Sequence, residues 1–128
     1  MSDSTRARNP QFAGTLAVGP IGTVAGRRPA GPNRTEQRYY DDFLAAQERA
    51  GAVTVHYQGL RVYLGNGHAY RPDWVAVTPA GRVTCIEVKG AHVHSRDSRL
   101  RFDAARAEWP CFAWVWAQWT GSEWRVER

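Results

Sequence analysis

The sequence predicts a mixed α+β (mixed α/β) domain built on one sheet. Two segments carry the start and stop signals of helices, and six short runs rich in Val, Tyr and Trp have the composition of strands. Turn-forming Gly and Pro residues separate many of these runs. At 128 residues and 43% hydrophobic composition, the chain is long enough and apolar enough to form one domain with a buried core.

Residues 1–32 differ in composition from the rest of the chain. Nine of these 32 positions are Gly or Pro, and the segment carries more basic than acidic side chains. We expect a flexible Gly-, Pro- and Arg-rich N-terminal arm, followed by a folded domain at residues 33–128. The arm has two readings, an unstructured leader or a basic segment that contacts DNA phosphates or a partner subunit.

The elements of the domain follow in the order α-β-β-β-β-α-β-β. Asn33 has the position of a helix N-cap with Glu36 three residues on, and Gly51 ends that helix. The second helix follows a polar stretch that ends near Asp97, and it stops before Pro110. The expected helices and strands are 33–50, 53–58, 60–64, 69–77, 83–89, 97–109, 112–119 and 124–127.

The turn at residues 79–81 predicts the register of the hairpin around it. Pro early in a type I turn followed by Gly in the left-handed position gives a three-residue loop, which pairs Thr78 with Arg82. Continuing that register places Asp73 opposite Glu87. Like charges directly opposed on a sheet are destabilising, so this pairing calls for a compensating cation.

Strand alternation puts Glu87 and Lys89, the only lysine in the chain, on the same face. Two carboxylates and a backbone carbonyl beside a lysine form a hard-oxygen site suited to Mg²⁺ or Mn²⁺. The amine could orient or activate a water molecule, which a guanidinium does poorly because it does not release its proton. The alternative is a surface hairpin with a Glu–Lys pair and an unrelated Asp73.

These residues resemble the signature of the PD-(D/E)xK nuclease superfamily. Pro72-Asp73 is followed after thirteen residues by Glu87-Val88-Lys89. The wider pattern resembles small phage proteins grouped with endonuclease-I-type Holliday junction resolvases. The pieces that match are Asn33-Arg-Thr-Glu36, Tyr70-Arg-Pro-Asp-Trp74, Glu87-Val-Lys-Gly90 and the Arg-rich helix that ends in Trp109-Pro110. The resemblance covers about residues 33–119.

The resemblance implies a restriction-endonuclease-like core, in which a central mixed sheet is flanked by helices, and a Mg²⁺-dependent DNA endonuclease. Asp73, Glu87 and the Val88 carbonyl would bind the metal, Mn²⁺ would substitute, and Lys89 would be the catalytic amine. Glu36 would match an acid on the first helix. Its position on one helical face with Tyr40, Phe43, Gln47 and Ala50 points it toward the buried side, although it could simply complete the capping box.

For partners, the resemblance implies branched DNA and a homodimer, because symmetric cutting of a junction needs two active sites. No small-molecule cofactor and no membrane segment are expected, and the location would be the cytoplasm, that of a host cell if the protein is phage-encoded. Linear, flap or single-stranded DNA are alternative substrates, and a non-catalytic nucleic-acid-binding module is the alternative class.

The net charge of +5 indicates a polyanionic partner. Basic side chains near the motif are the expected DNA contacts, with a solvated loop as the alternative for the histidines. Asp103 interrupts the basic character of the second helix. The expected contact residues are Arg71, His92, His94, Arg96, Arg99 and Arg101.

Overall fold

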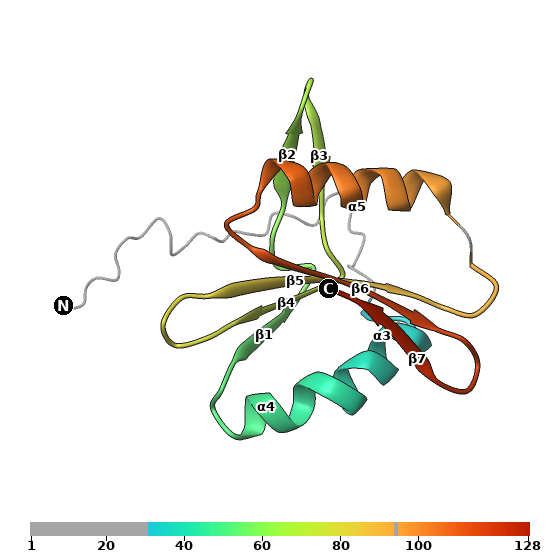
Figure 1. Cartoon of the computed structure of the whole chain (residues 1–128). Coiled ribbons are helices and arrows are strands. Elements are labelled where there is room, and N and C mark those ends of the chain that lie inside the picture. The colour runs from blue at the N-terminus through green and yellow to red at the C-terminus, as the bar shows by residue number, and fades with distance from the viewer. Residues whose placement is uncertain (1–30, 94) are drawn as a thin grey trace, which may run out of the picture. The chain divides into compact units, whose positions relative to one another are not determined.

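The computed structural model describes residues 31–93 and 95–128, of which Pro32–Arg128 form one unit. A five-stranded mixed sheet in the order β1-β4-β5-β6-β7 runs through its middle, with one helix on each face (Figure 1). A separate two-stranded sheet, β2-β3, rises on the same side as α5. The strands are β1 (Thr54–Tyr57), β2 (Val62–Gly65), β3 (His68–Tyr70), β4 (Trp74–Val77), β5 (Val83–Lys89), β6 (Ala113–Trp119) and β7 (Trp124–Glu127). The mixed α+β class is therefore confirmed, whereas the prediction of a single sheet is wrong.

The first helix contains a π-helical segment. It consists of α3 (Arg34–Tyr39), η3 (Tyr40–Leu44) and α4 (Ala45–Arg49). The capping box is present, because the Asn33 side chain accepts from the Glu36 N–H and the Glu36 carboxylate accepts from the Asn33 N–H. A π segment adds a residue to a turn and so changes which side chains share a face.

That change corrects the predicted buried face of the first helix. Tyr39, Leu44 and Ala45 are buried, whereas Gln47 and Ala50, which were expected on the buried side, are exposed. The prediction assumed an uninterrupted period of 3.6 residues. Glu36 lies before the π segment, so its predicted inward direction is unaffected, and its side chain is buried.

The hairpin of β4 and β5 has the register that its turn predicts. Val77 pairs with Val83 and Trp74 pairs with Ile86, so the ladder ends one position before Asp73 and Glu87. The single strand expected at residues 69–77 is wrong, since it is divided into β3 and β4. Pro72 lies in the break, where it is fully buried and, having no N–H, cannot donate to a ladder.

The helix α5 (Arg96–Glu108) links β5 to β6, which pair in parallel. Ser95 caps the start of α5 by accepting from the Ser98 N–H at 3.1 Å. Strand β7 then pairs antiparallel with β6 and forms one edge of the sheet. Strand β5 is thus the middle strand, with β4 on one side and β6 on the other.

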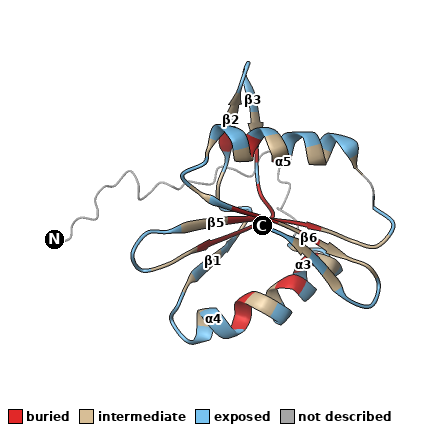
Figure 2. Cartoon of the chain, viewed as in Figure 1, coloured by how far each residue is buried: buried red, intermediate tan, exposed pale blue. Residues whose placement is uncertain are grey.

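Two apolar cores lie on opposite faces of the sheet, and buried residues line both of its sides (Figure 2). One core joins the first helix to the sheet through Tyr39, Leu44, Trp74, Ala76, Ile86, Val88, Val115 and Ala117. The other joins α5 and the small sheet to the opposite face through Val62, Tyr70, Cys85, Phe102, Ala105 and Trp114. Even-numbered positions of β5 therefore face the first helix, and Cys85 faces α5.

In the described part of the chain, neither helix has the length and apolar character that crossing a bilayer requires. The expected N-terminal arm, residues 1–32, lies outside the described residues except for its last two positions.

Candidate active site

Three buried carboxylates lie near the end of β5. Glu36, Asp73 and Glu87 are 8%, 9% and 6% exposed, and they are the buried charged residues of the described chain. They come from α3, from the residue before β4, and from β5. Burying an ionised carboxylate is costly unless it is paired and hydrogen-bonded, so the partners of each group indicate what the cluster does.

The Asp73 side chain accepts a hydrogen bond from β5 at a position where a neighbouring strand would normally offer a backbone carbonyl. Its Oδ2 accepts from the Val88 N–H at 2.8 Å, because β4 begins only at Trp74 and offers no carbonyl at that level. The N–H and C=O of one strand residue point to the same side, so the Val88 carbonyl is also directed toward the Asp73 side. The side chain and the carbonyl that the resemblance assigns to the metal therefore share one end of the hairpin.

Glu87 is held between a phenol and an amine. Its Oε1 accepts from the Tyr70 hydroxyl, and its Oε2 lies 3.1 Å from Lys89 Nζ. The lysine also donates to Ser98 Oγ at 3.1 Å and lies 5.9 Å from the ring centroid of Trp116. These contacts fix the amine beside the carboxylate, with its side chain 14% exposed.

Glu36 has both of the roles considered for it. Its Oε1 accepts from the Asn33 N–H at 2.9 Å, as a capping box requires, and from the Tyr57 hydroxyl at 2.8 Å. The Trp74 indole donates to the Glu36 carbonyl at 3.0 Å, which fastens α3 to β4 next to Asp73. Glu36 thus completes the cap and also faces the acidic cluster.

Gly90 allows the helix α3 to approach the end of β5 closely. A Cβ atom at this position would lie 3.2 Å from Thr35 Oγ1, which is tighter than most such contacts. The absence of a side chain therefore lets the first turn of α3 lie against the end of β5. This approach places Glu36 beside the carboxylates of the hairpin.

The electrostatics of the cluster show an excess of negative charge. The pKa of Asp73 is raised to about 8, first by burial and then by the charge of Glu87, with a further contribution from Glu36. The Val88 N–H acts in the opposite direction and lowers this pKa. The pKa values of Tyr70 and Tyr57 are raised by burial and by Glu87 and Glu36 respectively, so both phenols stay protonated and donate. Among the described residues, Lys89 is the amine that lies at the cluster.

The oxygen atoms of the cluster suit a divalent cation that takes only some of its ligands from the protein. Within residues 31–93 and 95–128, no three His, Cys, Asp or Glu side chains are placed to hold a metal together. Mg²⁺ commonly takes only one or two carboxylates and completes its shell with water and phosphate oxygens. Asp73 and Glu87 with the Val88 carbonyl would supply such a set, and a cation there would offset the charge of Glu87, which raises the pKa of Asp73 in addition to burial.

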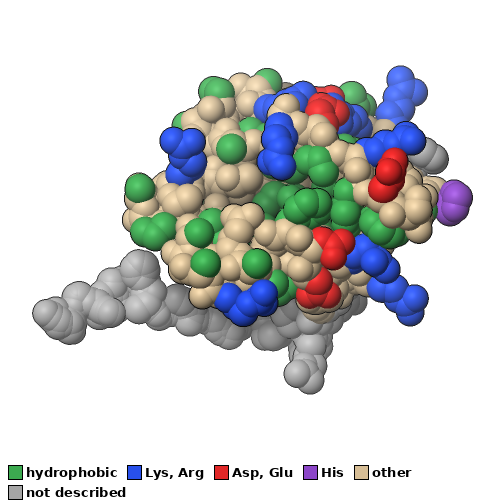
Figure 3. All heavy atoms as spheres, turned by 60° about the horizontal axis from the view of Figure 1, so that its bottom comes forward, with side chains coloured by type: hydrophobic (Ala, Val, Ile, Leu, Met, Phe, Trp, Pro, Cys, Tyr) green, Lys and Arg blue, Asp and Glu red, His purple; other side chains and the backbone are tan. Residues whose placement is uncertain are grey.

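The expected DNA contacts are only partly available. Arg71, His92, Arg96 and Arg101 are exposed, and His94 lies outside the described residues. Arg99 donates to Glu127 at 2.6 Å and to Asp103 at 3.3 Å, and it lies 4.8 Å from the Trp116 ring centroid. Its guanidinium is therefore occupied within the chain. Basic and acidic side chains are intermixed on the face that Figure 3 shows, so that face has no purely basic patch.

Sequence reasoning missed Tyr57, Tyr70 and Ser98, which hold Glu36, Glu87 and Lys89 respectively. Tyr70 is part of the segment that carries the resemblance, so its place three residues before Asp73 was the available signal. No sequence signal identified Tyr57 or Ser98, because their contacts depend on how β1 and α5 pack against the neighbouring elements.

The cluster combines opposed carboxylates, a fixed amine and neutral phenol donors at one end of a rigid hairpin. Such a group can bind a hard cation and position a water molecule for attack on a phosphate. Comparison of the chain with family models, curated proteins and solved structures found no match. The residues and their geometry therefore carry the functional proposal.

Proposed function

We propose that the protein is a divalent-metal-dependent DNA endonuclease that hydrolyses phosphodiester bonds, with Holliday-junction-like branched DNA as its preferred substrate. Mg²⁺ is the proposed ion, with Mn²⁺ as a substitute. The observation that carries the proposal is the pair of buried carboxylates, Asp73 and Glu87, at one end of a hairpin with Lys89 held 3.1 Å from Glu87. A purely structural hairpin would gain nothing from this arrangement, because opposed buried carboxylates destabilise it.

Each residue has a distinct part in the proposed chemistry. A divalent ion would neutralise the phosphodiester and lower the pKa of a bound water molecule. Asp73, Glu87 and the Val88 carbonyl would hold it, and Lys89 would orient the attacking water or stabilise charge on the phosphate. Glu36 would add negative charge beside Asp73 and favour cation binding.

The proposal extends to fold, partners and location. The arrangement of the mixed sheet between the first helix and α5 supports assignment to a restriction-endonuclease-like core in the PD-(D/E)xK superfamily. Symmetric junction cutting supports a homodimer, since the described residues of one chain offer one such cluster. A DNA substrate would be consistent with a cytoplasmic location, that of the host cell if the protein is phage-encoded. Arg71, Arg96 and Arg101 are exposed candidates for contacts to DNA phosphates.

Cleavage assays with matched variants test this function. The protein is incubated with a four-way junction, a flap and a linear duplex, each with Mg²⁺ or with EDTA. The wild type should cut the junction only with the metal. Asp73→Asn and Lys89→Ala should each lower the cleavage rate by roughly 10²–10⁴-fold, the usual effect of removing a positioned catalytic group.

Two control variants separate chemistry from general damage. Asp41→Asn removes an exposed carboxylate from the first helix, and Arg49→Ala removes an exposed cation at the end of α4, so both should cut at wild-type rates. DNA binding without metal-dependent cleavage of any substrate would overturn the enzyme assignment in favour of a binding module. Equal cutting of all three substrates would overturn the preference for branched DNA while leaving the nuclease.

A further inference from the structure

Lys89 has one hydrogen-bond donor more than its contacts use. A lysine ammonium carries three N–H groups. Two of them are directed to Glu87 Oε2 and to Ser98 Oγ, each at 3.1 Å. In the part of the chain that the structure describes, no other hydrogen bond or ion pair involves this amine. The side chain is 14% exposed, so the third N–H can reach a water molecule or a phosphate oxygen.

Two acceptors at fixed positions determine where the third N–H points. With Glu87 as its single acceptor, the amine could turn about the axis of that contact and carry its other two N–H groups with it. The contact with Ser98 stops this rotation, because the angles between the bonds of a tetrahedral nitrogen are fixed. The Trp116 ring, whose centroid lies 5.9 Å from the amine, occupies one further side of it.

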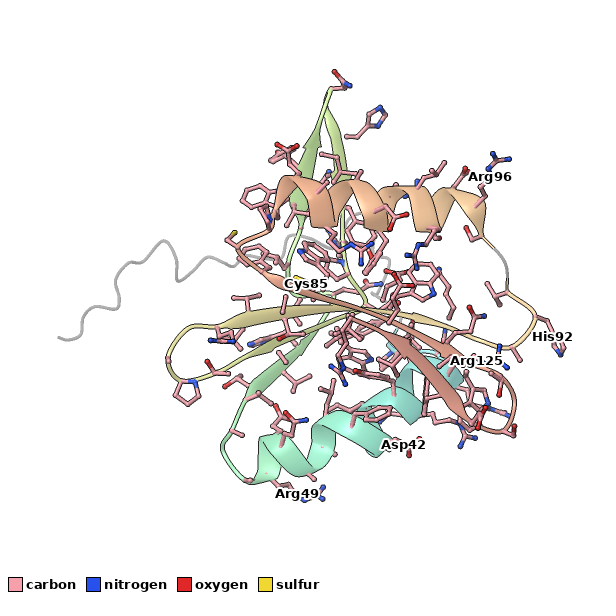
Figure 4. The ribbon with its side chains drawn as sticks, in the orientation of Figure 1. Asp42, Arg49, Cys85, His92, Arg96 and Arg125 are labelled. Carbon is pink, nitrogen blue, oxygen red and sulfur yellow. The ribbon has the colours of Figure 1, made fainter. Side chains whose placement is uncertain are left out.

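Ser98 itself is held in place by the start of α5. It lies in the first turn of that helix, and its N–H donates to Ser95 Oγ at 3.1 Å. Figure 4 shows Arg96, in the same turn, and His92, in the loop that follows β5, at the same end of the molecule. The hydroxyl therefore reaches Lys89 from a capped helix, and a regular element positions a side chain more precisely than a loop does.

The residue type at position 98 also indicates a role outside the helix. Ser98 is the third residue of α5, where a capping box carries Glu or Gln. The first helix has such an acid in Glu36, whereas α5 has only the half of the box that Ser95 supplies. A carboxylate at this position would compete with Glu87 for the amine of Lys89. A hydroxyl is a neutral acceptor, so it leaves the contact with Glu87 intact.

We propose that Ser98 orients Lys89 for the reaction, by holding the amine so that its third N–H faces the attacking water or the scissile phosphate. Ser98 is a positioning residue, because it acts on the substrate only through Lys89. This inference rests on the proposed function. It makes the start of α5 part of the catalytic arrangement, although that turn contributes no residue to the carboxylate cluster.

The single lysine of the chain makes this role measurable without cleavage. Labelling with ¹³C-lysine marks Lys89 alone, and relaxation of its ε-methylene in EDTA gives the order parameter of the amine end. Ser98→Ala should lower that order parameter by at least about 1.5-fold, the ratio between rigid and flexible groups. Ser98→Thr retains a hydroxyl and should keep the wild-type value. Ser122→Ala removes an exposed hydroxyl from the β6–β7 turn and is the matched control.

Cleavage of the four-way junction with Mg²⁺ gives the second readout. Ser98→Ala should lower the maximal single-turnover rate roughly 10- to 100-fold, because a displaced catalytic group slows the chemical step. The protein concentration that gives half of this rate should stay unchanged, since no contact with DNA is lost. Ser98→Thr should retain most of the rate, and Ser122→Ala all of it.

A further variant separates orientation of the amine from support of the helix. Ser98→Glu completes the capping box of α5, so a residue that served only the helix could be replaced in this way without loss. We expect slower cleavage instead, because the new carboxylate draws Lys89 away from Glu87. Thermal unfolding shows that each variant is folded, and Ala is a better helix former than Ser, so Ser98→Ala should stay folded.

An unchanged order parameter in a folded Ser98→Ala variant would overturn the proposal. Wild-type cleavage rates in Ser98→Ala or Ser98→Glu would overturn it too, and all of these results are compatible with an active nuclease. A wild type that cuts no DNA would instead contradict the proposed function and the reaction that Ser98 serves. In that case a loosened Lys89 in Ser98→Ala would still show that the hydroxyl holds the amine.

Discussion

Asp73 is the residue at which the demands of folding and of the proposed function oppose each other. Its carboxylate satisfies the Val88 N–H, which stabilises the hairpin end, yet it lies buried beside Glu87 and Glu36. Burial first, and then the charge of Glu87, raise the pKa of Asp73 to about 8, so the protonated form is favoured when no cation is bound. A group whose charge is unfavourable in the folded protein is typical of a site that binds a charged ligand.

The raised pKa gives a pH dependence of defined sign. Because the folded pKa of about 8 exceeds the ordinary value of 3.8, the folded state binds more protons between these limits, so the free energy of unfolding falls as pH rises. In EDTA, Asp73→Asn should flatten this slope and be more stable than the wild type at pH 8, by on the order of 1–3 kcal/mol. Urea unfolding from pH 5 to pH 8 measures the effect.

The matched control for this experiment is Asp41→Asn, which removes an exposed carboxylate and should keep the wild-type slope. Parallel slopes for Asp73→Asn and the wild type would contradict the assignment of the slope to Asp73. Added Mg²⁺ should raise the stability of the wild type at pH 8 more than that of Asp73→Asn, because an ion bound only to the folded state stabilises it.

The positions of Asp73, Glu87 and Lys89 could be predicted because they depend on local geometry. One turn fixes the register of a hairpin, and the alternation of a strand fixes which side chains share a face. The partners Tyr57 and Ser98 could not be predicted, since β1 and α5 reach the site only through tertiary packing. The same distinction holds for Arg99, whose ion pair with Glu127 joins residues that are distant in the chain.

At the scale of the elements, the π segment sets the relation between the two halves of the first helix. Glu36 and Tyr39 are buried before it, its own last residue, Leu44, is buried, and Ala45 is buried directly after it. A regular helix over the same stretch would turn one of these groups away, because one residue corresponds to about 100° of rotation. No sequence pattern in this helix indicates the extra residue of the π segment. The buried face predicted from a period of 3.6 residues was therefore wrong beyond Phe43.

Deleting Asp41 tests this role of the π segment. The deletion shortens the segment by one exposed residue and restores an α-helical phase, which moves Leu44 or Glu36 out of its buried position. We expect a loss of about 2–4 kcal/mol in the free energy of unfolding, the cost of removing a buried Leu side chain from a core. Asp41→Ala, which keeps the chain length, should change stability by less than about 0.5 kcal/mol. Equal stability of the deletion variant and the wild type would contradict the assignment.

The break between β3 and β4 has a comparable effect on the hairpin. Arg71, Pro72 and Asp73 leave the ladder, which frees the Asp73 side chain to bond with Val88. The Val and Trp content of residues 69–77 favours a continuous strand, and only the buried Pro72 indicates otherwise. Composition identified the strands, but their division between two sheets depends on the packing of Tyr70 against α5 and β6.

At the scale of the whole molecule, ion pairs join α5 to the last strand. Glu127 contacts Arg99 and Arg106, and Asp103 contacts the same two arginines. The pKa of Glu127 is lowered, first by its hydrogen bond with Arg99, so it remains ionised at neutral pH. This network links β7 to α5.

Replacing Glu127 by Gln measures the strength of this connection. Because all members are partly exposed, we expect the free energy of unfolding to fall by only about 0.5–1 kcal/mol at low salt. The difference should shrink in about 1 M salt, where charges are screened within roughly 3 Å. Denaturant unfolding of Glu127→Gln and of Glu123→Gln, which removes an exposed acid from the β6–β7 turn, provides the comparison. A loss that is insensitive to salt would contradict an ionic origin.

The central position of β5 has a consequence for biosynthesis. Its neighbour β4 precedes it along the chain, whereas its other neighbour, β6, is translated only after α5. Domains form as units during synthesis, and an unpaired strand exposes backbone groups that recruit other chains. A polypeptide that ends after α5 therefore contains Glu36, Asp73, Glu87 and Lys89 but presents β5 as an open edge. Such a fragment is a template for aggregation, and synthesis of β6 is the step that protects the newly made protein.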